Sequence, residues 1–178
     1  MRITTLAALI AASLALSPIA AAGSIDSCFD SAGNFYGIEP RLLRAIAQVE
    51  SSFRQDATHP NPDGSEDIGI MQINSWWLGT LSQYRIDRRT LILDACTNIN
   101  VGAWILKQAI RDNGYNWRAV GAYNAKSADK AAAYAQAVWH VYSGAGGHAS
   151  MAPVAQVRVN PASDPVQPKF TEEDSAGN

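Results

Sequence analysis

A helical repeat of apolar residues beside a single acidic residue restricts the fold of this chain more than any other feature. Between residues 40 and 53, apolar side chains recur at steps of three and four, and these are Leu42, Ile46, Val49 and Phe53. This spacing predicts a helix that buries one face, and Pro40 suits its first position because no helical partner is needed there. Glu50 borders the apolar face rather than the polar back of the helix.

The position of Glu50 has a chemical consequence. A carboxyl group at the edge of a core is partly removed from water, which favours its protonated form and raises its pKa. An acid that keeps its proton near neutral pH can donate it to a leaving group. The alternative is a solvated glutamate at the rim of the core, since glutamates are seldom buried. A second carboxylate, Asp67, follows seventeen positions later, the interval found between the glutamate and aspartate of lysozyme.

Three short motifs carry a family resemblance. They are V-E-S-S-F at residues 49–53, G-I-M-Q-I-N at 69–74 and A-Y-N-A at 122–125. Together they resemble the lytic transglycosylases of the lysozyme-like superfamily (the SLT domain), especially the small specialised type that accompanies type III or type IV secretion or pilus systems. Residues 67–77 also resemble the active-site strand region of chicken-type lysozyme. The resemblance extends from about residue 28 to residue 142, and it implies a mainly α (α+β) lysozyme-like domain.

The resemblance also implies an activity. A chain of this family would cleave peptidoglycan between N-acetylmuramic acid and N-acetylglucosamine with formation of a 1,6-anhydro ring, and would open the cell wall locally for such an apparatus. One alternative is a muramidase that hydrolyses the same bond with Glu50 and Asp67. Another is a non-catalytic scaffold that only binds glycan. Sugars pack on aromatic faces, so we expect either Trp76 or Trp77 to lie in the groove.

Partners and cofactors follow from composition and spacing. We expect no metal and no cofactor, because the three histidines do not have the spacing of metal ligands. The formal net charge of −2 argues against nucleic acid, which usually binds a basic surface. We therefore expect a monomer whose partner is peptidoglycan.

Roles for individual residues come from the same resemblance. Glu50 would protonate the glycosidic oxygen. Asp67 would stabilise the developing cation or position a water molecule, unless it is a loop aspartate that caps a turn. Gln72 would bind or orient a sugar, and Met71 would line the groove beside it.

A second set of implied roles lies near residue 123. Tyr123 would reach the catalytic glutamate with its hydroxyl group, and Asn124 would face the sugar; a core tyrosine with a hydrogen-bonded tip is the alternative. Two positions depart from the family pattern. Lys126 stands where a glycine is expected, and His59 stands where a serine is expected, so His59 receives no role.

Composition divides the chain into three parts. Residues 1–22 have the pattern of a Sec-type signal peptide, which implies export to the periplasm, with a membrane anchor as the alternative. Residues 23–143 should form the lysozyme-like domain. Residues 144–178 begin with glycines, contain four prolines and few apolar residues, and should be disordered. This tail would be either a docking segment for a secretion or pilus component or a simple linker.

The two cysteines are both outside the expected signal peptide. An exported chain with an even number of cysteines usually pairs them. We therefore expect a disulfide between Cys28 and Cys96, which would join the first helix to the start of a later one. Two free buried thiols are the alternative.

Periodicity and turn residues predict the remaining elements. Helices are expected at residues 25–36, 40–53, 75–84, 94–113, 117–123 and 128–142. Residues 56–66 should form a loop because they are dense in turn formers, and residues 67–74 fit either a strand edge or a helical turn. Residues 85–93 should form a connector whose Leu91 and Leu93 enter the core.

Overall fold

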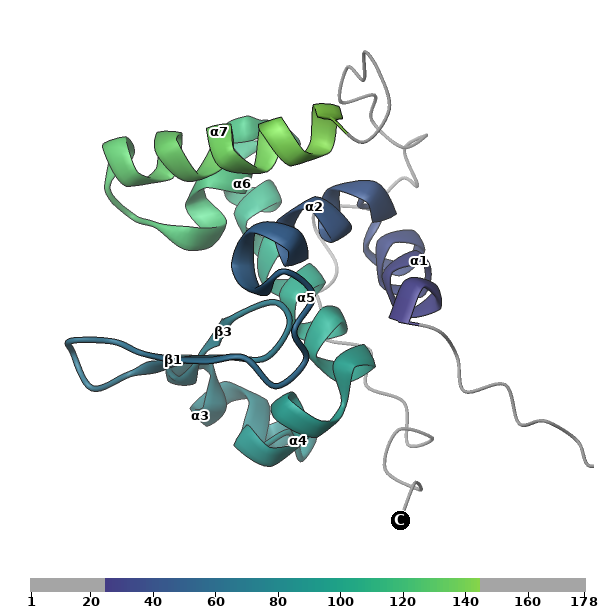
Figure 1. Cartoon of the computed structure of the whole chain (residues 1–178), viewed down its shortest axis with the longest axis vertical. Coiled ribbons are helices and arrows are strands. Elements are labelled where there is room, and N and C mark those ends of the chain that lie inside the picture. The colour runs from purple at the N-terminus through teal and green to yellow at the C-terminus, as the bar shows by residue number, and fades with distance from the viewer. Residues whose placement is uncertain (1–24, 145–178) are drawn as a thin grey trace, which may run out of the picture.

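Helices make up most of the structure, and they surround one long central helix (Figure 1). The computed structural model describes residues 25–144. Its helices are α1 (Ile25–Tyr36), α2 (Pro40–Ser51), α3 (Leu78–Leu81), α4 (Arg88–Leu93), α5 (Ala95–Asn113), α6 (Trp117–Asn124) and α7 (Ala128–Gly144). Its strands are β1 (Thr58–Pro60), β2 (Glu66–Ile68) and β3 (Ile73–Asn74), and two 3-10 turns, η1 (Ser75–Trp77) and η2 (Ser82–Tyr84), flank α3. The predicted mainly α fold with a small β component is confirmed.

The central helix α5 is buried along most of its length. It packs against α1, α4 and α6, and its fully buried apolar residues include Ile99, Val101, Ala103 and Leu106. Asp94 caps its first turn, because the carboxylate accepts a hydrogen bond of 3.0 Å from the Thr97 N–H. Gly114, with a φ of 81°, ends the helix. The other helices and the sheet are therefore built around one apolar axis.

A three-stranded antiparallel sheet follows α2 in the chain. Its strand order is β1-β2-β3, and Asp67 of β2 lies opposite His59 of β1 and Asn74 of β3. Residues directly opposite each other project to the same face of a sheet. These three polar side chains therefore share one face, while Ile68 and Ile73 are buried on the other.

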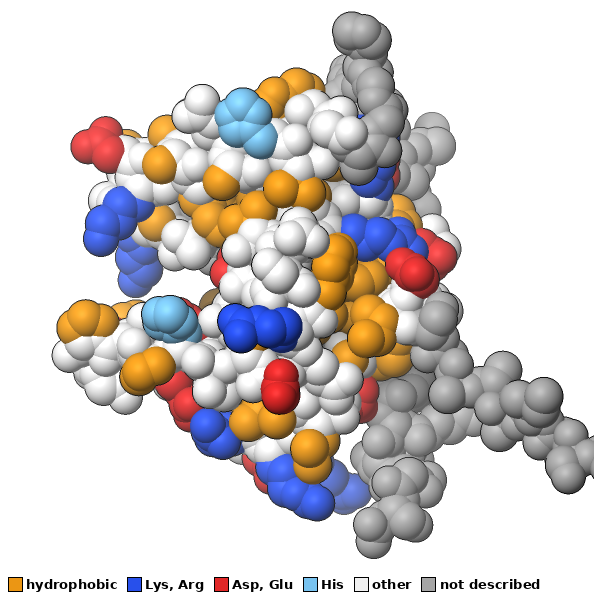
Figure 2. Space-filling model, viewed as in Figure 1, with side chains coloured by type: hydrophobic (Ala, Val, Ile, Leu, Met, Phe, Trp, Pro, Cys, Tyr) orange, Lys and Arg blue, Asp and Glu red, His pale blue; other side chains and the backbone are white. Residues whose placement is uncertain are grey.

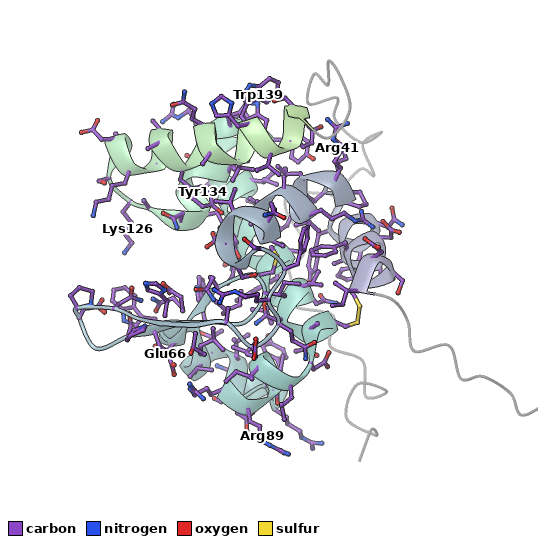
Figure 3. All side chains as sticks on the ribbon, viewed as in Figure 1. Arg41, Glu66, Arg89, Lys126, Tyr134 and Trp139 are labelled. Carbon is purple, nitrogen blue, oxygen red and sulfur yellow. A yellow bond between two sulfur atoms is a disulfide. The ribbon has the colours of Figure 1, made fainter. Side chains whose placement is uncertain are left out.

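A disulfide joins Cys28 in α1 to Cys96 in the first turn of α5, as expected from the export pattern and the even cysteine count. Its sequence separation is 68 residues. Figure 3 shows this sulfur–sulfur bond at the side of the molecule where α1 begins. The cross-link therefore fixes the first helix onto the central one.

Several element boundaries differ from those predicted. The helix expected to reach Phe53 ends at Ser51, because Ser52 and Phe53 adopt left-handed backbone conformations with φ of 52° and 62°. The connector at residues 85–93 contains the helix α4. Its Leu91 is fully buried as expected, but Leu93 is 59% exposed, so its predicted place in the core was wrong.

Two predicted segments lie outside the described residues. They are the signal peptide at residues 1–22 and, apart from Gly144, the tail at 144–178. Within residues 25–144, no helix combines the length and the apolar character that crossing a membrane requires.

Candidate active site

Glu50 lies in the last turn of α2. This helix has α6 and α7 on one side and the sheet on the other (Figure 1). Its side chain is partly buried, and its Oε1 accepts a hydrogen bond of 2.5 Å from the hydroxyl group of Tyr134 in α7. The pKa of Glu50 is raised to about 7, mainly because burial disfavours the charged carboxylate; the hydrogen bond from Tyr134 opposes this rise, and the nearby charge of Asp67 adds to it. The carboxyl group therefore keeps its proton in a large fraction of molecules near neutral pH.

The tyrosine that reaches Glu50 is Tyr134, so the role expected for Tyr123 was assigned to the wrong residue. The Tyr123 hydroxyl group donates instead to the carbonyl oxygen of Met71, at 2.8 Å. The two tyrosine rings stack, with their centroids 6.4 Å apart. Burial and the charge of Glu50 raise the pKa of both hydroxyl groups well above the ordinary value. Both tyrosines therefore remain hydrogen-bond donors at any physiological pH.

Asp67 faces the same part of the molecule as Glu50. Its Oδ1 accepts a hydrogen bond of 2.9 Å from the side-chain amide of Asn74, and its charge raises the pKa of Glu50. The neighbouring Glu66 points away, since its carboxylate pairs with Arg88, whose Nη2 lies 2.9 Å from Oε2. The structure thus separates the two adjacent acids and brings Asp67 within electrostatic range of Glu50.

The turn between β2 and β3 depends on close backbone contacts. Gly69 has a φ of 77°, and an added Cβ there would lie 2.1 Å from the side-chain nitrogen of Asn98. Gln72 has a φ of 48°, and its Nε2 donates to the carbonyl oxygens of Ala57 and Gly69 at 3.2 and 2.9 Å. The Gln72 amide therefore braces the turn, and only its Oε1 has no partner among residues 25–144.

Met71 does not line a groove, which corrects its expected role. Its side chain is fully buried against Gly102 of α5, where an added Cβ would lie 2.9 Å from it. The contribution of Met71 to the site comes from its carbonyl oxygen, which holds the Tyr123 hydroxyl group.

Asn98 supports the site but was not identified from the sequence. It is fully buried in α5, and its Oδ1 accepts a hydrogen bond of 2.9 Å from the Met71 N–H. Its Nδ2 donates to the carbonyl oxygens of Ile68 and Leu91, each at 2.9 Å. A polar residue within an otherwise apolar helical stripe was the available signal, because buried amides need partners.

Ser51 ties the end of α2 to the same turn. Its hydroxyl group is buried and donates to the Ile70 carbonyl oxygen at 2.8 Å. Residues Ser52 and Phe53 then turn the chain away in left-handed conformations, which cost non-glycine residues energy. The residue that follows Glu50 therefore anchors the helix end to the segment that carries Met71 and Gln72.

A hollow separates the α6–α7 side of the molecule from the sheet, and acidic atoms are visible at its inner end (Figure 2). Trp76 is 70% exposed, whereas Trp77 packs edge-on against Trp104 with ring centroids 5.2 Å apart. The Trp76 ring also lies below the ammonium group of Lys126, with Nζ 5.9 Å from its centroid. Asn124, at the end of α6, is exposed. We call this hollow the groove.

The described residues offer no evident place for a metal. Within residues 25–144, no group of three or more His, Cys, Asp or Glu side chains is arranged to hold a metal ion.

Comparison with known proteins adds a family match. The model described as the transglycosylase SLT domain matches residues 27–140. Invasion protein IagB of Salmonella typhimurium (strain SL1344) is 42% identical over 119 residues, which cover 65% of this chain and 74% of the relative. X polypeptide of Escherichia coli is 41% identical over 123 residues, covering 66% and 73% respectively. Protein IpgF of Shigella flexneri is 40% identical over 103 residues, covering 58% and 68%.

Proposed function

Since the chain belongs to the transglycosylase SLT domain family, we propose that it cuts peptidoglycan between N-acetylmuramic acid and N-acetylglucosamine and leaves a 1,6-anhydro end. Lytic transglycosylase activity comes with the family, and it replaces the alternative of a non-catalytic scaffold.

Glu50 performs both proton transfers in this proposal. It first gives its proton to the glycosidic oxygen, while the bond from that oxygen to C1 of the muramoyl sugar breaks. The C6 hydroxyl group of the same sugar then attacks C1, and its proton passes to the Glu50 carboxylate. The nucleophile is part of the substrate, so no water is consumed and the acid is restored. The supporting observation is the Glu50 pKa of about 7, which suits a group that is acid first and base second.

Tyr134 and Asp67 assist Glu50 in different ways. The Tyr134 hydroxyl group occupies Oε1, which leaves Oε2 of Glu50, unpartnered among residues 25–144, to meet the sugar oxygen. Asp67 supplies a negative charge that stabilises the oxocarbenium-like centre. Gln72 and Asn124 hold sugar hydroxyl or acetamido groups through their side-chain amides, Gln72 through its oxygen.

Product analysis tests this proposal. Murein sacculi digested with the wild-type protein should release muropeptides with anhydromuramoyl ends, identified by mass spectrometry. Glu50→Gln should abolish release, since an amide has no proton to donate at neutral pH. Glu66→Gln is the matched control, because Glu66 pairs with Arg88 outside the groove, and it should cut normally. A Glu50→Gln protein that still clears sacculi would contradict the assignment.

Hydrolysis is the second candidate, and the observation that favours it is the position of Asp67. An aspartate held by Asn74 beside the acid could orient a water molecule on the far side of C1. The product would then be a reducing end, heavier than the anhydro product by one water. The same mass analysis distinguishes the two reactions.

We further propose that the protein acts in the periplasm after export and opens the wall for a secretion, conjugation or pilus apparatus. One relative is named an invasion protein, and this supports a role beside such an apparatus. Residues 144–178 would then bind a component of the apparatus. Pull-down with and without these residues tests the idea, and equal recovery of the component from both forms would contradict it.

A further inference from the structure

Lys126 reaches from one side of the groove toward the other. It lies in the turn between α6 and α7, and its side chain points toward the side of the molecule that carries the sheet (Figure 3). Its Nζ is 5.9 Å from the centroid of the Trp76 ring, which belongs to η1 on the opposite side. The attraction between an exposed ammonium group and an indole face is weak. The contact can therefore be exchanged for another partner.

This contact lies beside the reacting groups. On the Trp76 side, the Trp76 N–H donates to Asn74, whose side-chain amide holds Asp67. On the Lys126 side, α6 ends two residues before Lys126 and carries Tyr123. Burial and the charges of Glu50 and Asp67 raise the pKa of the Tyr123 hydroxyl group. A ligand bound between these walls would therefore lie near the Lys126 ammonium group.

Lys126 also lacks an acidic partner. In the part of the chain that the structure describes, the three ion pairs involve Arg44 and Arg88, and no carboxylate lies within ion-pair distance of Lys126. The substrate carries the missing charge. The lactyl group of N-acetylmuramic acid ends in a carboxyl group, which is ionised where no peptide is attached and otherwise continues into a peptide with carboxylates of its own. N-acetylglucosamine has no such group.

We propose that Lys126 is a specificity-determining residue that leaves the Trp76 ring and pairs with a carboxylate on the muramoyl substituent of the bound glycan. The same movement uncovers the indole face, on which a sugar ring then packs. This inference rests on the proposed function and extends it, because it names the substrate group that the groove recognises beyond the glycosidic bond. It also gives a role to the lysine that stands where the family pattern has glycine.

Binding to a pair of matched ligands tests the inference without any chemistry. The probe is a tetrasaccharide of alternating N-acetylglucosamine and N-acetylmuramic acid with free lactyl carboxylates, and its control is the same tetrasaccharide with those groups converted to methylamides. Titration calorimetry in the Glu50→Gln background measures both affinities. At low salt the acid should bind roughly two- to fivefold more tightly than the amide, the range expected for one exposed ion pair. Salt should reduce this preference.

The variants assign the preference to one residue. Lys126→Gln should lower the affinity for the acid to that for the amide and leave the amide affinity unchanged, whereas Lys126→Arg should keep the preference. Lys130→Gln is the matched control, since Lys130 is an exposed lysine one turn away in α7. The Lys130→Gln variant should prefer the acid over the amide as strongly as the parent Glu50→Gln protein does.

Three results would overturn this inference without touching the proposed function. They are an undiminished preference for the acid in Lys126→Gln, an equal loss of affinity for both ligands in Lys126→Gln, or the same loss of preference in Lys130→Gln. If neither ligand bound to the parent protein, the glycan groove itself would be refuted, and the proposed function with it.

Discussion

Replacing Tyr134 by Phe removes the hydroxyl group that donates to Glu50, the proposed catalytic acid, and leaves the aromatic ring in place. The lost hydrogen bond of 2.5 Å lowers the pKa of Glu50, so its removal should raise that pKa from about 7. A hydrogen bond to a charged group contributes about 1.5–3 kcal/mol. Since about 1.36 kcal/mol corresponds to one pKa unit, the rise should be at least about one unit, even if water partly replaces the hydroxyl group.

The pH dependence of turnover reports this change. In the proposed mechanism the first step needs protonated Glu50, so activity should fall on the alkaline side as that proton is lost. In Tyr134→Phe this alkaline limb should move up by about one pH unit. The plateau rate should fall by roughly tenfold, because Glu50 loses the group that orients it. Initial rates of anhydromuropeptide release between pH 5 and pH 9 measure both effects, and carbon NMR of labelled Glu50 gives the pKa directly.

Tyr123→Phe is the control for this experiment. Its hydroxyl group bonds to the Met71 carbonyl oxygen rather than to Glu50, so the alkaline limb should stay in place even if stability falls. An alkaline limb that does not move in Tyr134→Phe, or that moves to lower pH, would refute the reasoning. A shift of the same size in both variants would also refute it, because the effect would then reflect packing rather than the hydrogen bond.

Three further expectations concern stability. The pKa of Glu50 rises on folding, so the native state binds more protons between about pH 4.5 and 7, and the free energy of unfolding falls as pH rises through this window. Glu50→Gln should therefore be more stable than wild type at pH 8, by up to about 3 kcal/mol, and should differ little from it at pH 4. Urea unfolding at the two pH values measures this difference. Replacing Cys28 and Cys96 by Ser should destabilise the domain by up to about 4 kcal/mol, the chain-entropy value for a loop of this length. Reductant should lower the melting temperature of the wild-type protein by as much as the double substitution does. Asn98→Ala should destabilise by roughly 3 kcal/mol because three buried backbone groups lose their partner. Asn100→Ala should change stability little in the same assay, because the Oδ1 of Asn100 has no partner among residues 25–144.

Local periodicity was enough to place the main helices. α1 has the predicted bounds, and the predicted 94–113 helix differs from α5 only by its capping residue, because apolar steps and capping side chains act within one element. The motif around Glu50 likewise placed the acid on a helix end. Local pattern could not predict that Ser52 and Phe53 leave the helix, because the neighbouring Ser51 is anchored to Ile70, 19 residues further along the chain.

The partners of Glu50 could not be predicted in the same way. Tyr134 lies 84 residues from Glu50, and the two meet only because α7 packs on α2. A tyrosine on the apolar face of a helix looks like an ordinary core residue, and the motif directed attention to Tyr123 instead. Met71 was misplaced for a related reason, as only the packing of its side chain on Gly102 shows that it points away from the groove. Leu93 was misplaced because nothing in a short apolar run shows which leucine faces solvent.

The long sequence separation between Glu50 and Tyr134 also has a consequence for the synthesis and folding of the enzyme. Glu50, the proposed proton donor, lies in the first half of the chain, and its hydroxyl partner Tyr134 lies in the last helix of the described domain. A nascent or truncated polypeptide that stops before residue 134 already contains Glu50, but it lacks the group that holds this acid in position. Under the proposed mechanism, full activity therefore requires that nearly the whole domain has been synthesised and has folded.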